Sequence, residues 1–164
     1  MFVFKVIDSP LGKLTLVASG KGLAGVLWEN ESPGRVKLEP RRADPSNAIL
    51  VEAERQLQKY FAGELKEFNL ELDFQGTDFQ KQVWNKLLSI PFGKTRSYSD
   101  IARALNNPSA VRAVGAANGR NPISIVAPCH RVIGASGKLT GFAGGLEAKE
   151  FLLRHESQSD SKTS

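Results

Sequence analysis

The sequence predicts an α+β fold, in which a small N-terminal α/β domain of antiparallel sheet and one helix packs on a mostly helical C-terminal domain with a helix-turn-helix. Three short apolar runs separated by turn residues open the chain, and a helical periodicity follows them. From about residue 76, short helical patterns replace the strand patterns. The 164 residues, 41% of them hydrophobic, suffice for two small domains that share an interface. We place these domains at residues 1–75 and 76–156.

The N-terminal domain is expected to begin with an antiparallel meander. Residues 2–8, 13–18 and 23–28 are rich in Val, Leu and Phe, and the breaks between them contain Gly and Ser or Pro. Residues 29–44 carry two prolines, a glycine and many charges, so they are expected to form a surface loop. Residues 68–74 alternate apolar and polar side chains and are a candidate further strand.

One helix is expected between the meander and that candidate strand. Asp44 suits the cap position and Pro45 the first helical position, and Gly63 marks the end. Its apolar face consists of Ile49, Leu50, Ala53, Leu57, Tyr60 and Phe61. Nothing in this half of the chain has a catalytic pattern, so we expect the domain to brace the rest.

The C-terminal domain is expected to contain three short helices before its cysteine. Thr77 and Gln80 form a capping box for the first helix. Ser97 is expected to cap the second helix, and Asn107 the third, with Pro108 at the first helical position. The apolar face of the first helix consists of Phe79, Val83, Trp84, Leu87 and Leu88.

The second and third helices form a helix-turn-helix candidate, although short helical hairpins also occur as plain packing units. The small residues of the third helix allow close approach to another surface. The chain has a net charge of +5 and a pI of about 9.5, which permits an anionic partner. The excess is uneven, with Asp100 as the one acid among Lys86, Lys94, Arg96, Arg103, Arg112 and Arg120. This asymmetry favours a nucleic-acid-binding face in the second half.

Residues 126–134 hold the one cysteine of the chain, Cys129, and one of its two histidines. A lone cysteine is commonly a small buried hydrophobe. Here Pro128 stiffens the backbone before it, and His130 and Arg131 favour the thiolate, which would lower the thiol pKa below its ordinary value of about 8.5. Both an inert and a nucleophilic cysteine are therefore open at this point.

A single cysteine excludes an internal disulfide and, with two histidines, argues against a structural zinc site. A thiol kept for chemistry suits a reducing compartment, so a cytoplasmic location is expected. The N-terminus lacks a signal-peptide pattern, and no apolar run approaches the length of a membrane span.

The chain after the cysteine is expected to form a glycine-rich loop at residues 135–145 and then a helix that ends at His155-Glu156. Residues 157–164 are polar and lack apolar anchors, which predicts a disordered tail.

Several ordered motifs within residues 79–156, roughly half of the chain, are similar to one known family. They are Pro91-Phe92-Gly93, Ser97-Tyr98, Arg112-Ala113-Val114-Gly115, Asn121-Pro122, Pro128-Cys129-His130-Arg131-Val132, Leu139-Thr140-Gly141-Phe142-Ala143-Gly144-Gly145-Leu146, and Lys149 with Leu152-Leu153 and His155-Glu156. On these residues the chain resembles the O6-alkylguanine-DNA alkyltransferases, which are self-alkylating DNA repair proteins.

The resemblance implies direct-reversal repair of double-stranded DNA that carries O6-alkylguanine, and also O4-alkylthymine, bound through the minor groove. The damaged nucleotide is extruded from the stack, and its alkyl group passes irreversibly to Cys129 as a thioether. One molecule then repairs one lesion, as a monomer, with no cofactor and no metal.

The resemblance also implies roles for individual residues. Cys129 is the nucleophile, His130 takes its proton through a water, and Glu156 orients His130. Neighbours on a strand point to opposite faces, so either that water or a turn at Cys129 is needed. Asn121 braces the segment that bears Cys129, and Tyr98 presses on the DNA backbone and hydrogen-bonds the flipped base.

Arg112 is expected to fill the gap left in the base stack, while Arg96 and Arg103 contact DNA. Val132, Phe142 and Ala143 are expected to line the base pocket. Phe142 stands where some members have tyrosine and Ala143 where some have serine, so a hydroxyl contact is lost and the range of accepted alkyl groups is in question. Taken individually, Tyr98 also fits a core aromatic, Arg112 a surface cation and Glu156 a helix-end charge.

Two other classes of function fit parts of the sequence. A non-catalytic DNA-binding module would use the helical pair and leave Cys129 inert. A cysteine hydrolase would pair Cys129 with His130 or His155 and turn over repeatedly.

Overall fold

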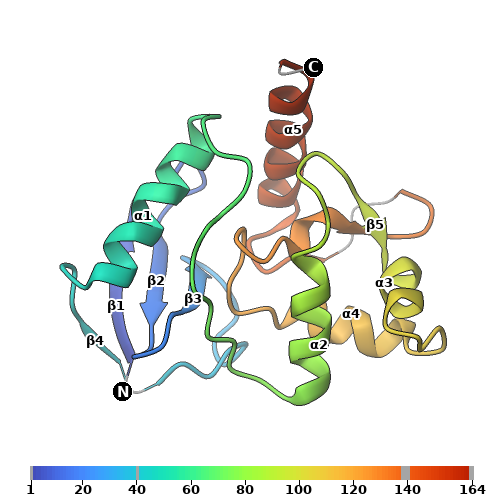
Figure 1. Cartoon of the computed structure of the whole chain (residues 1–164), viewed down its shortest axis with the longest axis horizontal. Coiled ribbons are helices and arrows are strands. Elements are labelled where there is room, and N and C mark those ends of the chain that lie inside the picture. Colours follow the sequence, from blue (N-terminus) through green and yellow to red (C-terminus); the bar gives the residue numbers. More distant parts are fainter. Residues whose placement is uncertain (1, 40, 138–140, 163–164) are drawn as a thin grey trace.

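The structure, a computed structural model, describes residues 2–39, 41–137 and 141–162. Figure 1 shows a sheet and the helix α1 on one side, and the short helices α2, α3 and α4 on the other. The last helix, α5, stands between the two halves at the top of that view. Within the described residues, no helix is long and apolar enough to cross a membrane.

The N-terminal sheet has the strand order β3-β2-β1-β4. Its strands are β1 (Phe2–Ile7), β2 (Leu14–Ala18), β3 (Leu23–Trp28) and β4 (Arg41–Ala43). The first three pair antiparallel, which confirms the predicted meander. The expectation that residues 29–44 form only a loop was wrong, because β4 pairs in parallel with β1. A three-residue strand is too short for its periodicity to be recognised.

Helix α1 (Ala48–Phe61) is capped by Asn47, whose side chain accepts from the backbone N–H groups of Ile49 and Leu50. The prediction that Asp44 caps it and Pro45 begins it was wrong. The backbone N–H of Asp44 donates instead to the carbonyl of Phe4, at 3.0 Å, and ties this segment to the sheet edge. Gly63 has a φ of 79° just after the helix, as a glycine at that end should.

Residues 68–74 do not form the predicted strand. Within the described residues they make one bridge, between Leu72 and Leu23, supported by backbone hydrogen bonds from Leu23 to Glu71 and from Asp73 to Leu23. Gly22 allows this contact, because a Cβ there would lie 2.7 Å from the carbonyl oxygen of Glu71. The segment therefore lies along the sheet and carries the chain to the second half.

The C-terminal domain contains α2 (Asp78–Leu87), α3 (Tyr98–Ala104) and α4 (Val111–Gly119). The capping box predicted at Thr77 and the cap predicted at Ser97 are confirmed. The prediction that Asn107 caps α4 and Pro108 begins it was wrong, because the cap residue is Ala110 and the carbonyl of Asn107 accepts its N–H in a turn. Leu88, expected on the buried face of α2, is 43% exposed at the end of that helix.

Helix α5 (Leu146–Lys162) continues past Glu156, so the prediction of a disordered tail was wrong as far as Lys162. Residues 163 and 164 lie outside the described residues. Residues 157–162 are helical because a helix anchored by buried Leu152 and Glu156 adds further turns at little cost in free energy, even when those turns are polar.

Two hydrophobic clusters share the segment around the cysteine. The larger joins the sheet, α1 and α5 to residues 123–127, and the second joins α2, α3 and α4 to Cys129 and Val132. A short parallel pair, β5 (Arg96–Ser97) with β6 (Val132–Ile133), links the start of α3 to the residues after Cys129. The cysteine segment is thus held by both halves of the molecule.

Candidate active site

Cys129 begins η1 (Cys129–Arg131), a single 3₁₀ turn in a stretch that is buried from Asn121 to Val132. The backbone N–H of Cys129 donates to the carbonyl of Ala127, and that of Arg131 to the carbonyl of Pro128. Ile125 has a φ of 73°, which is rare for a β-branched residue and stores strain next to the site. Because Cys129 and His130 lie in a 3₁₀ turn, the two-residue alternation of side chains in a strand does not apply to them.

Asn121 lies where the predicted brace should be. Its Nδ2 donates to the carbonyl of Ala127 at 2.8 Å, and its Oδ1 accepts from the backbone N–H of Ile123 at 3.0 Å. The side chain is fully buried and also hydrogen-bonds the thiol of Cys129. Asn121 therefore fixes the backbone before the cysteine, and its hydrogen bond to the thiol lowers the pKa of Cys129.

Arg35, from the loop after β3, holds Asn121 in turn. Its Nη1 donates to the carbonyl oxygens of Asn121, at 2.8 Å, and Gly119, at 3.1 Å. The same guanidinium pairs with Glu31, and both side chains are about nine-tenths buried. A charged pair of the N-terminal domain thus clamps the end of α4 to the start of the cysteine segment.

His130 and Glu156 form the predicted pair, although they come from different elements. Nε2 of His130 lies 2.7 Å from Oε2 of Glu156 on α5, and both side chains are fully buried. Because the carboxylate accepts at Nε2, the neutral imidazole carries its proton there and presents Nδ1 as an acceptor. This buried Nδ1 has no hydrogen-bond partner among the described residues.

Glu156 has two further partners. Nε and Nη2 of Arg131 donate to its two oxygens at 2.8 and 2.9 Å, and the hydroxyl of Tyr60 on α1 donates to Oε2 at 2.7 Å. Nη1 of Arg131 donates to the carbonyl of Ile90. Burial opposes the charge of Glu156, but the hydrogen bonds from His130 and Arg131 and the charge of Arg131 outweigh it and hold the pKa of Glu156 far below its usual value.

The expectation that Arg131 and His130 lower the thiol pKa was wrong. Burial raises the pKa of Cys129, and the opposing influences are the Asn121 hydrogen bond and the charges of Arg35 and Lys149. Arg131 is occupied by Glu156 instead. Burial likewise lowers the pKa of His130, despite the neighbouring Glu156, so His130 is neutral. The resting site is therefore a thiol beside a neutral imidazole.

Two of the predicted base-pocket residues, Val132 and Phe142, pack in the same hydrophobic cluster as Cys129. Val132 is fully buried, and its carbonyl accepts from Nζ of Lys149 at 2.7 Å. Phe142 and Ala143 are half-buried in the loop before α5. Leu139 and Thr140, which also support the family resemblance, lie outside the described residues.

Trp28, at the end of β3, supports that loop. Its ring meets the ring of Phe142 edge to face, with centroids 5.5 Å apart. A Cβ on Gly144 would lie 2.7 Å from the Trp28 ring, so the glycine lets the loop rest directly on the indole. Trp28 of the N-terminal sheet therefore fixes the position of the loop that contains Phe142 and Gly144.

The predicted DNA-contacting residues lie on the helical half. Tyr98 is the first residue of α3, and its half-buried ring faces Gly115 of α4. Arg112 is exposed near the start of α4, and Arg96 is exposed with its guanidinium donating to the carbonyl of Thr95.

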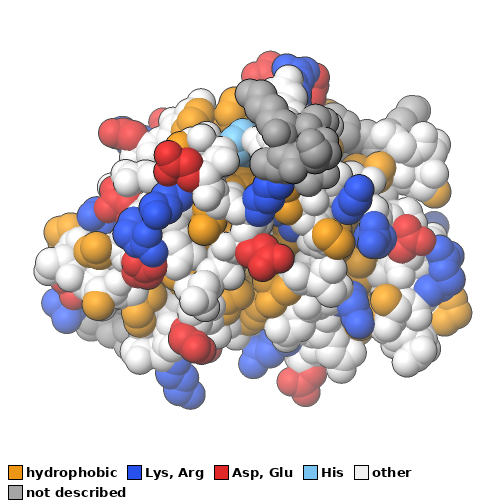
Figure 2. Space-filling model, turned by 45° about the horizontal axis from the view of Figure 1, so that its top comes forward, with side chains coloured by type: hydrophobic (Ala, Val, Ile, Leu, Met, Phe, Trp, Pro, Cys, Tyr) orange, Lys and Arg blue, Asp and Glu red, His pale blue; other side chains and the backbone are white. Residues whose placement is uncertain are grey.

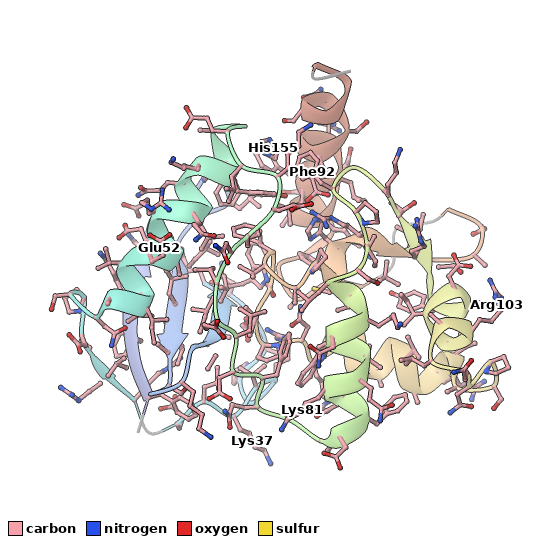
Figure 3. The ribbon with its side chains drawn as sticks, viewed as in Figure 1. Lys37, Glu52, Lys81, Phe92, Arg103 and His155 are labelled. Atoms are coloured by element: carbon pink, nitrogen blue, oxygen red, sulfur yellow. The ribbon has the colours of Figure 1, made fainter. Side chains whose placement is uncertain are left out.

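Arg103 points outward from α3 in Figure 3, and it pairs with Asp100 on the same helix. Lys and Arg side chains spread over the right-hand side of Figure 2, the side of the helical half.

The functional residues that the sequence did not reveal come from the N-terminal domain. Arg35 clamps Asn121, Trp28 supports the loop at Phe142, and Tyr60 reaches Glu156. No local motif marks them, because each contact joins residues more than 80 positions apart in the chain. In Figure 3, Phe92 and His155 mark the place where the end of α1 meets α5, and both rings pack on Tyr60.

Comparison with known proteins points to a single family. Residues 2–74 match the family described as 6-O-methylguanine DNA methyltransferase, ribonuclease-like domain, and residues 78–158 match 6-O-methylguanine DNA methyltransferase, DNA binding domain. Two similar proteins are named methylated-DNA–protein-cysteine methyltransferase. The one from Methanosarcina acetivorans is 51% identical over 93% of this chain and 97% of its own length, and the one from Mycobacterium tuberculosis is 51% identical over 95% and 93%.

Among solved structures, an OGT from Mycobacterium tuberculosis in complex with DNA superposes with a TM-score of 0.88 at 49% identity, covering 96% of this chain and 94% of that chain. The same organism's O6-methylguanine methyltransferase superposes with a TM-score of 0.85 at 50% identity, covering 97% and 94%. These likenesses span both halves of the molecule.

Proposed function

The chain belongs to the 6-O-methylguanine DNA methyltransferase family, and we propose that Cys129 is the residue that accepts the alkyl group. The protein repairs DNA by moving the methyl group of O6-methylguanine irreversibly to its own cysteine, so one molecule repairs one lesion. Because the sequence contains one cysteine, no other thiol can be the acceptor. A repeatedly acting hydrolase and an inert binding module are both set aside by this membership.

The observation that carries the mechanism is the buried Nδ1 of His130, which has no partner among the described residues while Nε2 is held by Glu156. A water between Nδ1 and the thiol would relay the proton from Sγ of Cys129 to the imidazole. The thiolate then attacks the alkyl carbon, a C–S bond forms, and the C–O6 bond breaks. The electron pair leaves with guanine, which takes up a proton. Glu156 stabilises the imidazolium that forms.

Burial favours this order of events. The thiol is held as a thiol in the closed site, because burial raises its pKa, so proton removal takes place when the substrate is in position. The Asn121 hydrogen bond and the charges of Arg35 and Lys149 then stabilise the thiolate. A low dielectric makes each of these interactions stronger than it would be in water.

We assign the remaining site residues to the DNA. Arg112 enters the stack in place of the flipped nucleotide, Tyr98 presses on the target's backbone and donates to the departing base, and Arg96 contacts phosphate. Arg103 contacts DNA by leaving its exposed partner Asp100, which costs little because exposed ion pairs contribute little. The approach is through the minor groove, which the small residues of α4 allow.

Val132, Phe142 and Ala143 line the pocket for the base, with backbone groups supplying the polar contacts. O6-alkylguanine in duplex DNA is the main substrate and O4-alkylthymine a further one. We also propose that the protein acts as a monomer in the cytoplasm, where a free thiol is kept reduced. The two matched segments leave residues 75–77 between them, which supports a domain boundary there.

The test is a single-turnover reaction with a duplex that carries one O6-methylguanine. The tryptic peptide with Cys129 should gain the mass of a methylene, and the lesion should disappear in equal amount. Cys129→Ser should retain DNA binding and lose transfer. An unmodified peptide with the lesion intact would contradict the assignment.

A further inference from the structure

Tyr60 is the one point at which a side chain of α1 enters the hydrogen-bond network of the active site within the described residues. Its hydroxyl donates to Oε2 of Glu156 at 2.7 Å, across 96 positions of the chain. The side chain is fully buried and packed among the rings of Phe68, Phe92 and His155. The backbone carbonyl of Tyr60 lies 2.7 Å from Nε2 of His155, so α1 and α5 are fastened twice at this place. The hydroxyl is therefore held in one position.

The oxygen that receives this hydroxyl is the same one that holds His130. Oε2 of Glu156 lies 2.7 Å from Nε2 of His130, 2.7 Å from the Tyr60 hydroxyl and 2.9 Å from Nη2 of Arg131. Among the described residues, Oε1 accepts from one donor, Nε of Arg131. Three donors share the negative charge of Oε2, so each receives a weaker bond than it would alone.

This sharing matters because His130 has to be neutral before it can take the proton of the thiol. A buried carboxylate that bonded His130 alone would stabilise the imidazolium strongly and leave the base already protonated. We propose that Tyr60 is a positioning residue for alkyl transfer, whose hydroxyl occupies Oε2 of Glu156 and limits how strongly that carboxylate draws a proton onto His130. This inference rests on the proposed role of His130 as the base for Cys129.

The other charged groups around His130 either favour or disfavour its protonated form. From α5, Glu156 favours the imidazolium and Lys149 disfavours it, and Arg131 on the same turn also disfavours it. Cys129 is uncharged in the resting site, and burial lowers the pKa of His130. From α1, Tyr60 is a permanent donor, since burial and the neighbouring Glu156 raise its pKa well above the ordinary value. Its contribution can therefore be removed without changing the charge of the site.

The experiment compares the wild type with Tyr60→Phe, which deletes one oxygen and keeps the ring. The rate of transfer is measured in single turnover, at saturating methylated duplex, from about pH 5.5 to about pH 9. Without the hydroxyl, Oε2 bonds His130 more strongly, so the acid limb of the profile should move to higher pH. At pH values well below the pKa of His130, a move of about half a pH unit means a rate about threefold lower, whereas near pH 8.5 the rate is little changed.

A second measurement reads the base directly. The chain has two histidines, so a spectrum of the ¹⁵N-labelled imidazoles contains two ring systems. His130 should titrate at higher pH in Tyr60→Phe, with Nδ1 still the unprotonated nitrogen of its neutral form. A change confined to thermal stability would not move this signal.

The matched control is Gln56→Met on the same helix. Gln56 is also buried, and it exchanges two hydrogen bonds of 2.9 Å with the backbone of Asn69, neither of which involves Glu156. Its loss should lower the unfolding temperature and leave the pH profile of transfer in place.

A Tyr60→Phe profile that superimposes on the wild type, that falls equally at every pH, or that moves to lower pH would overturn the inference. Absence of transfer by the wild type would instead reject the proposed function, so the two failures can be told apart.

Discussion

Asn121→Ala tests how the cysteine segment is held. The amide of Asn121 bridges two backbone groups of its own loop, the N–H of Ile123 and the carbonyl of Ala127, at 3.0 and 2.8 Å. Alanine removes both bonds and leaves the helices untouched. All three residues are fully buried, so water cannot replace the amide without opening the segment.

The expected loss follows from these two orphaned groups. A buried backbone group without a partner costs about 1–3 kcal/mol, so two cost about 2–6 kcal/mol, and relaxation of the loop favours the middle of that range. A loss of about 3 kcal/mol corresponds to a fall of about 6–12 °C in the unfolding temperature of a chain of this size. The pKa of the thiol should rise further, because the Asn121 hydrogen bond lowers it.

The assay is urea unfolding followed by tryptophan fluorescence, with single-turnover transfer measured on the same preparations. Asn118→Ala is the control. Asn118 is also buried, at the end of α4, but its Oδ1 has no partner among the described residues, so its loss should cost clearly less. Equal destabilisation by the two variants, or a loss below about 1 kcal/mol for Asn121→Ala, would refute the reasoning.

Three further predictions follow from other parts of the site. Arg35→Leu leaves buried Glu31 without its partner, so thermal unfolding should show a loss of about 3–5 kcal/mol, and a value near zero would contradict the clamp. Gly144→Ala should slow single-turnover transfer about 10- to 100-fold, because the Cβ collides with Trp28 and displaces the loop. Gly141→Ala, whose Cβ would meet no atom of the described residues within 4 Å, is its control and should transfer normally. The lowered pKa of His130 means that the unfolded chain binds its proton first, so stability should fall as pH drops below about 6.5. In urea unfolding between about pH 8 and pH 5, His130→Asn should flatten this fall, and an unchanged slope would contradict it.

Local signals in the sequence predicted the local structure where nothing competed with them. Thr77 and Ser97 cap their helices, since each completes its hydrogen bonds within the same turn. Asp44 and Asn107 carry an equally good cap signal with a following proline, but neither caps a helix. Asp44 is paired with the carbonyl of Phe4 on the sheet, and that contact cannot be read from neighbouring residues.

In the site too, residues with local or family signals could be predicted, whereas contacts between distant parts of the chain could not. Cys129 and His130 could be proposed from chemistry, and Glu156 from the family resemblance. The charge of Arg131 was assigned to the thiol because they are neighbours in sequence, whereas the fold gives it to Glu156, 25 positions away. Tyr60 and Arg35 could not be predicted, because their functional partners are 96 and 86 positions distant.

The left-handed backbone of Ile125 bears on the order in which the molecule assembles. A β-branched residue at a φ of 73° costs about 1–3 kcal/mol, so a free chain adopts this conformation in only a minor fraction of molecules. The segment that contains Ile125 packs on the sheet through Ile123 and on the helical half through Cys129. The packing energy that offsets the strain is therefore gained only after both halves have docked. The turn that carries Cys129 is therefore expected to form late in folding. A chain with one half unfolded would not hold Cys129 in the geometry needed for alkyl transfer. Amides at residues 123–131 should accordingly exchange only through global unfolding, at the slowest rates in the chain.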